Sequence, residues 1–130
     1  MFHRDLLPLI LGAAASLTSC RDGTGPALTG RWAATGIELI ALPQTGELRL
    51  ACAIPAPITH GLLPDSAGLI RFSTTVQPVW GTPYHIDFQG QLVEDSLYAT
   101  LTYPGPPPVA RTYSLVRDGD AGLDKIFCAQ

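Results

Sequence analysis

Apolar and polar residues alternate along most of the chain after residue 28. The clearest example is the segment 84–103, in which two alternating runs, 84–92 and 97–103, flank the short connection 93–96. Successive side chains of a β-strand point to opposite faces, so this alternation is typical of strands with one buried face. The segment 84–103 is therefore predicted to form one long β-hairpin.

Six further alternating or apolar runs predict strands at 28–34, 37–42, 48–54, 68–76, 110–117 and 124–128. Helix signals are almost absent, and the 13 Gly and 12 Pro residues follow no period, which argues against helix bundles and collagen. Short connections between successive strands favour an antiparallel meander. We expect an all-β domain, a small antiparallel meander closed into an eight-stranded barrel. The alternative is a two-sheet β-sandwich, in which the first and last strands do not pair.

The first twenty residues have a different pattern. An apolar run of twelve residues, 6–17, follows a short polar start that contains Arg4. Because a membrane-spanning helix needs about 20 apolar residues, the run is too short to span and fits the apolar part of a secretion signal. A buried core helix is the alternative. Leu17-Thr18-Ser19-Cys20, at the end of this run, resembles a lipobox, the cleavage motif of bacterial lipoprotein precursors.

The lipobox resemblance implies three segments: a signal peptide at 1–19, a lipidated N-terminus and tether at 20–27, and an antiparallel β-domain at 28–130. By this resemblance, a signal peptidase cuts before Cys20, and Cys20 carries acyl chains, palmitate among them. Two or more acyl chains anchor a protein stably. The domain is then expected in the bacterial cell envelope, anchored to the outer or plasma membrane, in the periplasm or outside the cell.

The chain contains three cysteines, and the predicted lipid is attached to one of them, Cys20. An exported domain lies in an oxidising compartment, where paired thiols form disulfides. We therefore predict a disulfide between Cys52 and Cys128. The alternative is a metal site that adds His60 or His85, but the chain contains no C-x-x-C or H-x-x-x-H spacing.

Gly30-Arg31-Trp32 resembles the Gly-x-Trp opening strand of lipocalin-like and avidin-like small β-barrels. In lipocalins, a basic residue from the last strand packs on this tryptophan. The resemblance implies that role for Arg111 or Arg117. The alternative is that Trp32 is simply a core aromatic near one end of the barrel.

Charge and motifs exclude several function classes. The chain has 8 Lys and Arg against 11 Asp and Glu, a formal charge of −3, so it has no basic surplus for nucleic acid. It lacks G-x-S-x-G, G-x-G-x-x-G and Walker loops, and we expect neither enzymatic activity nor a cofactor. Asp118, Asp120 and Asp124 have a spacing that hints at a calcium loop, but Gly122 and Leu123 replace a ligand and a glycine that an EF-hand needs. A tight polar turn is the alternative.

Two loops are candidates for the rim of a barrel mouth. The longest irregular stretch, 55–67, contains His60 and Leu62, and the segment 77–83 contains Trp80. The expected function is a non-catalytic binding module for a protein partner or a small apolar ligand. Strands rich in Leu, Ile, Phe and Tyr indicate a filled interior, which favours the protein partner. The alternative is a structural or inhibitory envelope protein with no small-molecule ligand.

Overall fold

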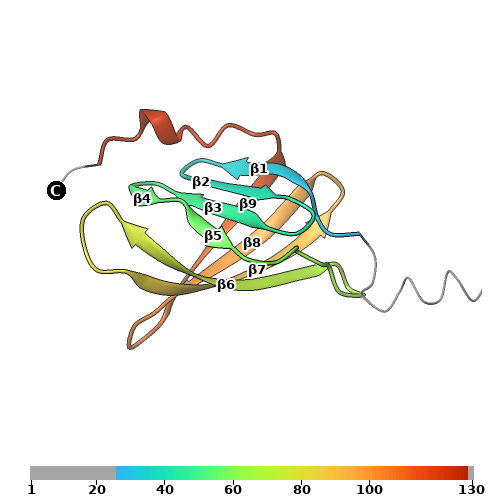
Figure 1. Ribbon diagram of the computed structural model, residues 1–130, viewed down its shortest axis with the longest axis horizontal. Coiled ribbons are helices and arrows are strands. Elements are labelled where there is room, and N and C mark those ends of the chain that lie inside the picture. The colour runs from blue at the N-terminus through green and yellow to red at the C-terminus, as the bar shows by residue number, and fades with distance from the viewer. Residues whose placement is uncertain (1–25, 129–130) are drawn as a thin grey trace, which may run out of the picture.

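A computed structural model describes residues 26–128 of the 130-residue chain. These residues contain one short 3-10 helix, η2 (Leu123–Lys125), and no helix among them is long and apolar enough to cross a membrane. The rest of the regular structure is antiparallel strand (Figure 1). The strands are β1 (Gly30–Ala34), β2 (Ile37–Ala41), β3 (Gly46–Leu50), β4 (Ala53–Ile54), β5 (Ala56–Ile58), β6 (Leu69–Pro78), β7 (Tyr84–Val93), β8 (Ser96–Tyr103) and β9 (Val109–Arg117).

The strands form one sheet in the order β4-β6-β7-β8-β9-β1-β2-β3-β5. The strands at the two ends of this order, β4 and β5, are consecutive in the chain and only Pro55 separates them. β4 pairs with β6 and β5 pairs with β3, so the segment 53–58 bridges the two ends of the sheet. The hydroxyl of Thr74 in β6 also donates to the carbonyl oxygen of Pro57 in β5, at 2.8 Å. The sheet is thereby nearly closed, which confirms the predicted all-β barrel.

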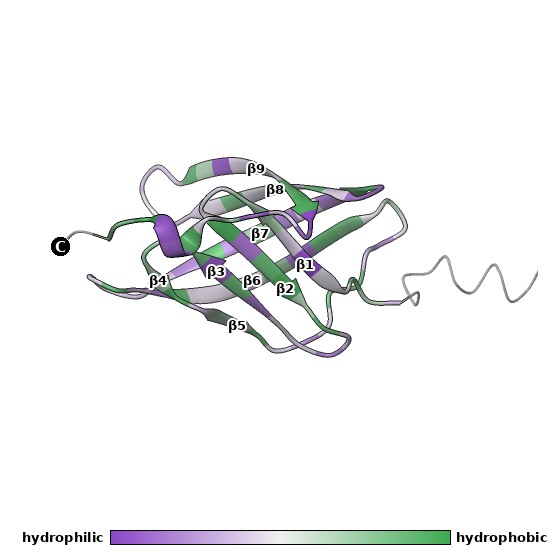
Figure 2. Cartoon of the chain, turned by 90° about the horizontal axis from the view of Figure 1, so that it is seen from above, coloured by the Kyte–Doolittle hydropathy of each residue, from purple (hydrophilic) through white to green (hydrophobic). Residues whose placement is uncertain are grey.

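Alternating apolar side chains fill the barrel interior, and Figure 2 shows their bands along the strands. Phe72 and Phe88 face each other across β6 and β7, with stacked rings 4.5 Å apart. Each fully buried aliphatic or aromatic side chain contributes about 1.5–3 kcal/mol. Gly90 makes room for its neighbours, because a Cβ there would lie 2.9 Å from Cδ1 of Leu97. The largest fully buried side chains are Trp32, Phe88, Ile37, Leu39, Leu48, Leu62, Ile70, Ile86, Leu97, Leu101, Leu115 and Val76.

The local predictions hold for the long strands and for β1 and β2, and they fail around β4 and β5. The hairpin at 84–103 is confirmed as β7 and β8. The run 48–54 is not one strand, because Cys52 has a left-handed backbone (φ 60°) that interrupts the extended chain between β3 and β4. Cys52 therefore does not lie on an apolar strand face, and Ile54 is 54 % exposed. The barrel has nine strands and not eight.

Two further predictions are wrong. Residues 56–58, which were expected to be irregular, form β5 and pair with β3. Residues 124–128 were expected to form a last strand, but they contain the end of η2 and Phe127, which is 88 % exposed. Residues 124–128 do not pair with β9, because at Val116 and Arg117 the edge of β9 that faces away from β8 is already paired with β1.

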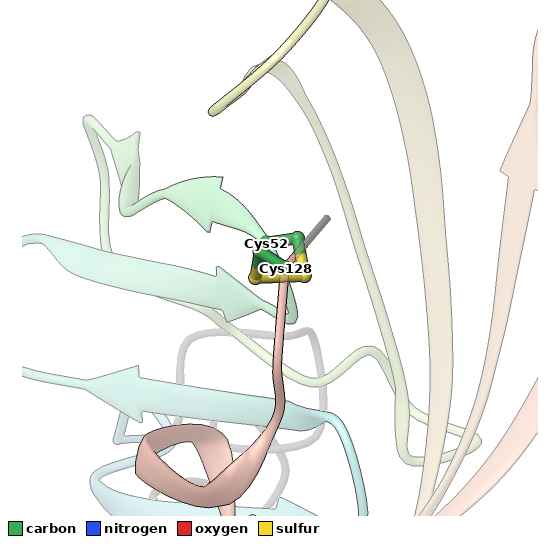
Figure 3. Close-up of a disulfide and its surroundings, with 2 residues drawn as sticks. All are labelled: Cys52 and Cys128. Carbon is green, nitrogen blue, oxygen red and sulfur yellow. A yellow bond between two sulfur atoms is a disulfide. The ribbon is translucent and has the colours of Figure 1, made fainter. Parts of the chain in front are cut away.

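The residues after β9 cross the outer face of β1 and β2 as a strap, defined here as 118–128 (Figure 1). The Gly36 N–H donates to the carbonyl oxygen of Ala121 in the strap, at 2.9 Å. Gly119 allows close approach, since a Cβ there would lie 2.9 Å from the carbonyl oxygen of Ala33. The strap ends in the predicted Cys52–Cys128 disulfide (Figure 3), which is confirmed.

The two ends of the barrel differ. One, called the closed end here, contains the entering segment 26–29, the β2–β3 turn, the loop 59–68 and the β7–β8 turn. Leu62 is buried at this end and its carbonyl oxygen accepts the Leu28 N–H at 2.7 Å. The other, called the open end, contains the β1–β2 and β3–β4 turns and the β6–β7 and β8–β9 loops. Figure 1 shows the described chain entering at the end opposite to the β6–β7 loop.

Candidate binding site at the open end

The three expected rim residues do not form one rim. His60 and Leu62 precede the ten-residue strand β6, and Trp80 follows it. At about 3.3 Å per residue, these loops lie roughly 30 Å apart, at opposite ends of the barrel. Leu62 is 1 % exposed, so the prediction that it contacts a partner is wrong; its aliphatic side chain fills the closed end. His60 is exposed, with Nδ1 2.9 Å from the Gly61 carbonyl oxygen, and Trp80 is 52 % exposed at the open end.

A hollow of about 410 Å³ lies at the open end. Its main feature is three half-buried tyrosines from adjacent strands, Tyr84 of β7, Tyr103 of β8 and Tyr113 of β9. Each lies two residues from a buried core residue on the same strand, so all three face the barrel interior. The rings of Tyr84 and Tyr103 are 5.8 Å apart. The hollow is lined by Gly36, Leu50, Ala51, Tyr84, Tyr103, Val109, Arg111 and Tyr113.

The electrostatics of the hollow combine neutral phenols with one cation. Burial raises the pKa of Tyr103, and the neighbouring Tyr113 hydroxyl raises it further. Burial also raises the pKa of Tyr84. Arg111 lies on the same face as Tyr113, and none of the ion pairs among residues 26–128 involves it. The hollow therefore offers aromatic surface, protonated hydroxyl groups and an arginine without an acidic partner in the described part of the chain.

The hollow lies where β9 separates from β1. β8 pairs with β9 over its whole length, from Tyr103↔Val109 to Ser96↔Val116. β1 pairs with β9 only at Trp32↔Arg117 and Ala33↔Val116. β1 ends at Ala34 and the chain turns back at Gly36, whose φ of 84° favours glycine. Within residues 26–128, the first half of β9 thus has a strand on one side only.

The closed end contains the contact expected from the Gly-x-Trp resemblance. The Arg117 guanidinium lies 4.3 Å from the centre of the buried Trp32 ring, so Arg117 and not Arg111 makes this contact. The Trp32 Nε1–H donates to the Thr29 carbonyl oxygen at 3.2 Å, and the Arg117 Nε–H donates to Asp95 Oδ1 at 3.3 Å. A Cβ at Gly30 would lie 3.0 Å from Arg117 Nη1, so glycine leaves room for the guanidinium. This arrangement covers the closed end of the barrel with Trp32 and Arg117.

The calcium candidates form a turn in the strap. Asp120 Oδ1 accepts the Gly122 N–H at 2.9 Å, and Asp118 has a left-handed backbone. Among residues 26–128, no three His, Cys, Asp or Glu side chains, including Asp118, Asp120 and Asp124, gather closely enough to hold a metal ion.

One Ser, His and Asp set lies on the outer face of β6 and β7. The Ser73 hydroxyl donates to Asp87 Oδ1 at 2.6 Å, and His85 Nε2 lies 3.9 Å from the same oxygen. A catalytic serine needs a hydrogen bond to its base, whereas Ser73 bonds the carboxylate directly. The set does not have the geometry of an activated nucleophile.

Cys20, the lipobox and the first part of the tether lie outside the described residues. Comparison with protein-family profiles, with curated proteins and with solved structures found no match to this chain.

Proposed function

We propose that this chain is a lipoprotein of the bacterial cell envelope, anchored through Cys20, whose β-domain is a non-catalytic binding module. The observation that carries the proposal is the hollow of about 410 Å³ at the open end, with Tyr84, Tyr103 and Tyr113 in it. Concave sites with much apolar surface and a few polar groups are the usual form of binding pockets. Tyrosine and arginine are also the residues most enriched where partners bind tightly.

The place where the described chain enters the barrel is compatible with the proposed anchor and the proposed site together. Residues 26–29 enter the barrel at the closed end. A lipid on Cys20, six residues before residue 26, keeps the closed end near the membrane. The hollow then faces away from the membrane, where a partner can reach it.

The filled interior favours a protein partner over a small ligand held deep in the barrel. Deeper in the barrel than the tyrosines, Leu39, Leu48 and Leu101 are completely buried, as expected for an interior filled by side chains. The hollow is thus shallow and open to the side, next to Val109 and the β8–β9 loop. A segment of another protein can occupy such a site, whereas an apolar small molecule there keeps much of its surface in water.

The lipid anchor is tested with a Cys20→Ser variant of the full chain, expressed in a bacterium with radiolabelled palmitate. We expect complete loss of the label, because the thiol that accepts the acyl group is gone. Cys128→Ser is the matched control and keeps the label. Equal labelling of the Cys20→Ser variant and the unmodified chain would contradict the anchor.

The binding site is tested with residues 21–130, which contain the whole described barrel and its disulfide, as bait in an envelope extract. Tyr103→Ala is expected to reduce retention of the captured protein about tenfold or more, as truncation of a central interface aromatic does. Leu63→Ala is the control, since Leu63 is an accessible large apolar side chain that lies at the closed end. Capture of nothing by the unmodified bait, or equal capture by Tyr103→Ala, would count against the open end.

A further inference from the structure

We propose that the first half of β9, residues 109–114, is a site for β-strand addition by an extended, acidic segment of a protein partner. This inference rests on the proposed function and names the partner that the open end takes. It is carried by three observations: unpaired backbone groups on the edge of β9, the hollow beside that edge, and the charge of Arg111.

The hydrogen bonds at the end of β9 show which backbone groups face the free side. The backbone N–H of Arg117 donates to the carbonyl oxygen of Asp95, on the β8 side, at 3.1 Å. The backbone N–H of Asp118 donates to the carbonyl oxygen of Arg31, on the β1 side, at 2.7 Å. Backbone groups of successive residues in an extended strand point to alternate sides. The N–H and C=O groups of Ala110, Thr112 and Ser114 therefore face the side from which β1 has departed.

These edge groups are open to a partner. Ala110, Thr112 and Ser114 are exposed, and the structure pairs them with no strand on that side within residues 26–128. A row of unpaired backbone donors and acceptors is a template for another strand. At the other end of the strand order, β4 pairs with β6 only at Gln77 and Pro78, and β5 meets β6 through the Thr74 side chain, which donates to the Pro57 carbonyl oxygen. The free edge of β9 is the one that lies next to the hollow.

An added strand has a defined place. It occupies the position that a longer β1 would take, antiparallel to β9, as β1 itself is. Every second side chain of the added strand then points toward the interior face, on which Tyr113 and Arg111 lie. Backbone pairing of this kind supplies affinity, and pockets for alternate side chains supply specificity. The tyrosine-lined hollow is such a pocket.

The charge at the site selects the partner. Arg111 lies in the lining of the hollow, and no ion pair among the described residues involves it. A guanidinium binds a carboxylate through two parallel hydrogen bonds, so an acidic side chain or a C-terminal carboxylate fits here. Two copies of this chain joined through the same edges would bring their Arg111 side chains into one interface, which disfavours a second copy as the occupant.

The test is a selection of random decapeptides displayed on phage against residues 21–130. We expect the enriched peptides to be acidic. When such a peptide binds, the backbone amides of Ala110, Thr112 and Ser114 are expected to exchange hydrogen more slowly. Thr112→Pro removes one edge N–H and leaves the pairing with β8 intact, and it is expected to weaken these peptides tenfold or more. Thr112→Val is the matched control, since it keeps the N–H and suits a strand. Arg111→Glu is expected to shift the enrichment to basic peptides.

Each other outcome overturns the inference. Enrichment of no peptide, or equal binding to Thr112→Pro, shows that the edge is not used; the open end as such is judged separately by the Tyr103→Ala capture. Protection of the same amides in the free protein, together with a doubled mass in solution, shows a second copy as the occupant. If circular dichroism shows that Thr112→Pro does not fold, Ala110→Pro at the start of the strand replaces it.

Discussion

Trp32→Ala is expected to lower the free energy of unfolding by about 3–5 kcal/mol, the range for truncation of a buried tryptophan. Trp32 is completely buried and forms part of the seal of the closed end. Its removal leaves a cavity and also leaves the Arg117 guanidinium without the ring that it covers at 4.3 Å. Neighbouring strands cannot collapse onto the space easily, because β1 is paired on both sides there. Denaturant unfolding followed by circular dichroism measures the change.

The chain provides its own control in its second tryptophan. Trp80 is 52 % exposed in the β6–β7 loop, so Trp80→Ala is expected to change the free energy of unfolding by no more than about 0.5 kcal/mol. Arg117→Leu removes the cation above Trp32 and is expected to cost about 1 kcal/mol. Similar losses from Trp32→Ala and Trp80→Ala would show that Trp32 does not seal the closed end.

Alternation predicted the long strands well because it is a local property. β6, β7, β8 and β9 each continue for eight or more residues, long enough for a period of two to be recognised. β4 and β5 have only two and three residues. Cys52 lies in the turn between β3 and β4, and Pro55 separates β4 from β5. The left-handed backbone of Cys52 lies in the turn where the chain meets the strap and its disulfide. A contact between residues 76 positions apart leaves no periodic trace in the sequence.

The candidate site was only partly predictable for the same reason. Tyr84, Tyr103 and Tyr113 lie within predicted strands, but their meeting depends on the register of β7, β8 and β9. The free edge depends on a difference in strand length. β1 has five residues and ends at Ala34, so it does not reach the first half of the nine-residue β9. Loops such as 59–68 carry no period, so the burial of Leu62 was not visible in the sequence.

Removing the disulfide with the double variant Cys52→Ser/Cys128→Ser is expected to lower the free energy of unfolding by about 2–4 kcal/mol. Loop closure sets a ceiling on this loss, since cross-linking residues 76 positions apart restricts the unfolded chain by about 4.5 kcal/mol. The structure indicates a loss below that value, because Cys128 lies at the end of the strap and not within a strand of the barrel. Without the bond, the strap can leave the outer face of β1 and β2 while the barrel stays folded.

The detached strap offsets part of the loss, because its freed residues regain backbone conformational entropy. Opposing this gain, the strap gives up its cover of Ala33 and the hydrogen bond from Gly36 to Ala121. Hydrogen exchange at the Gly36 N–H therefore separates the two effects: it is expected to lose protection in the double variant, while the amides of β7 and β8 keep theirs. Reductant is the matched treatment and is expected to destabilise the unmodified protein but leave the double variant unchanged. Uniform loss of protection across β7 and β8 in the folded variant would show that the bond holds the barrel as a whole and not only the strap.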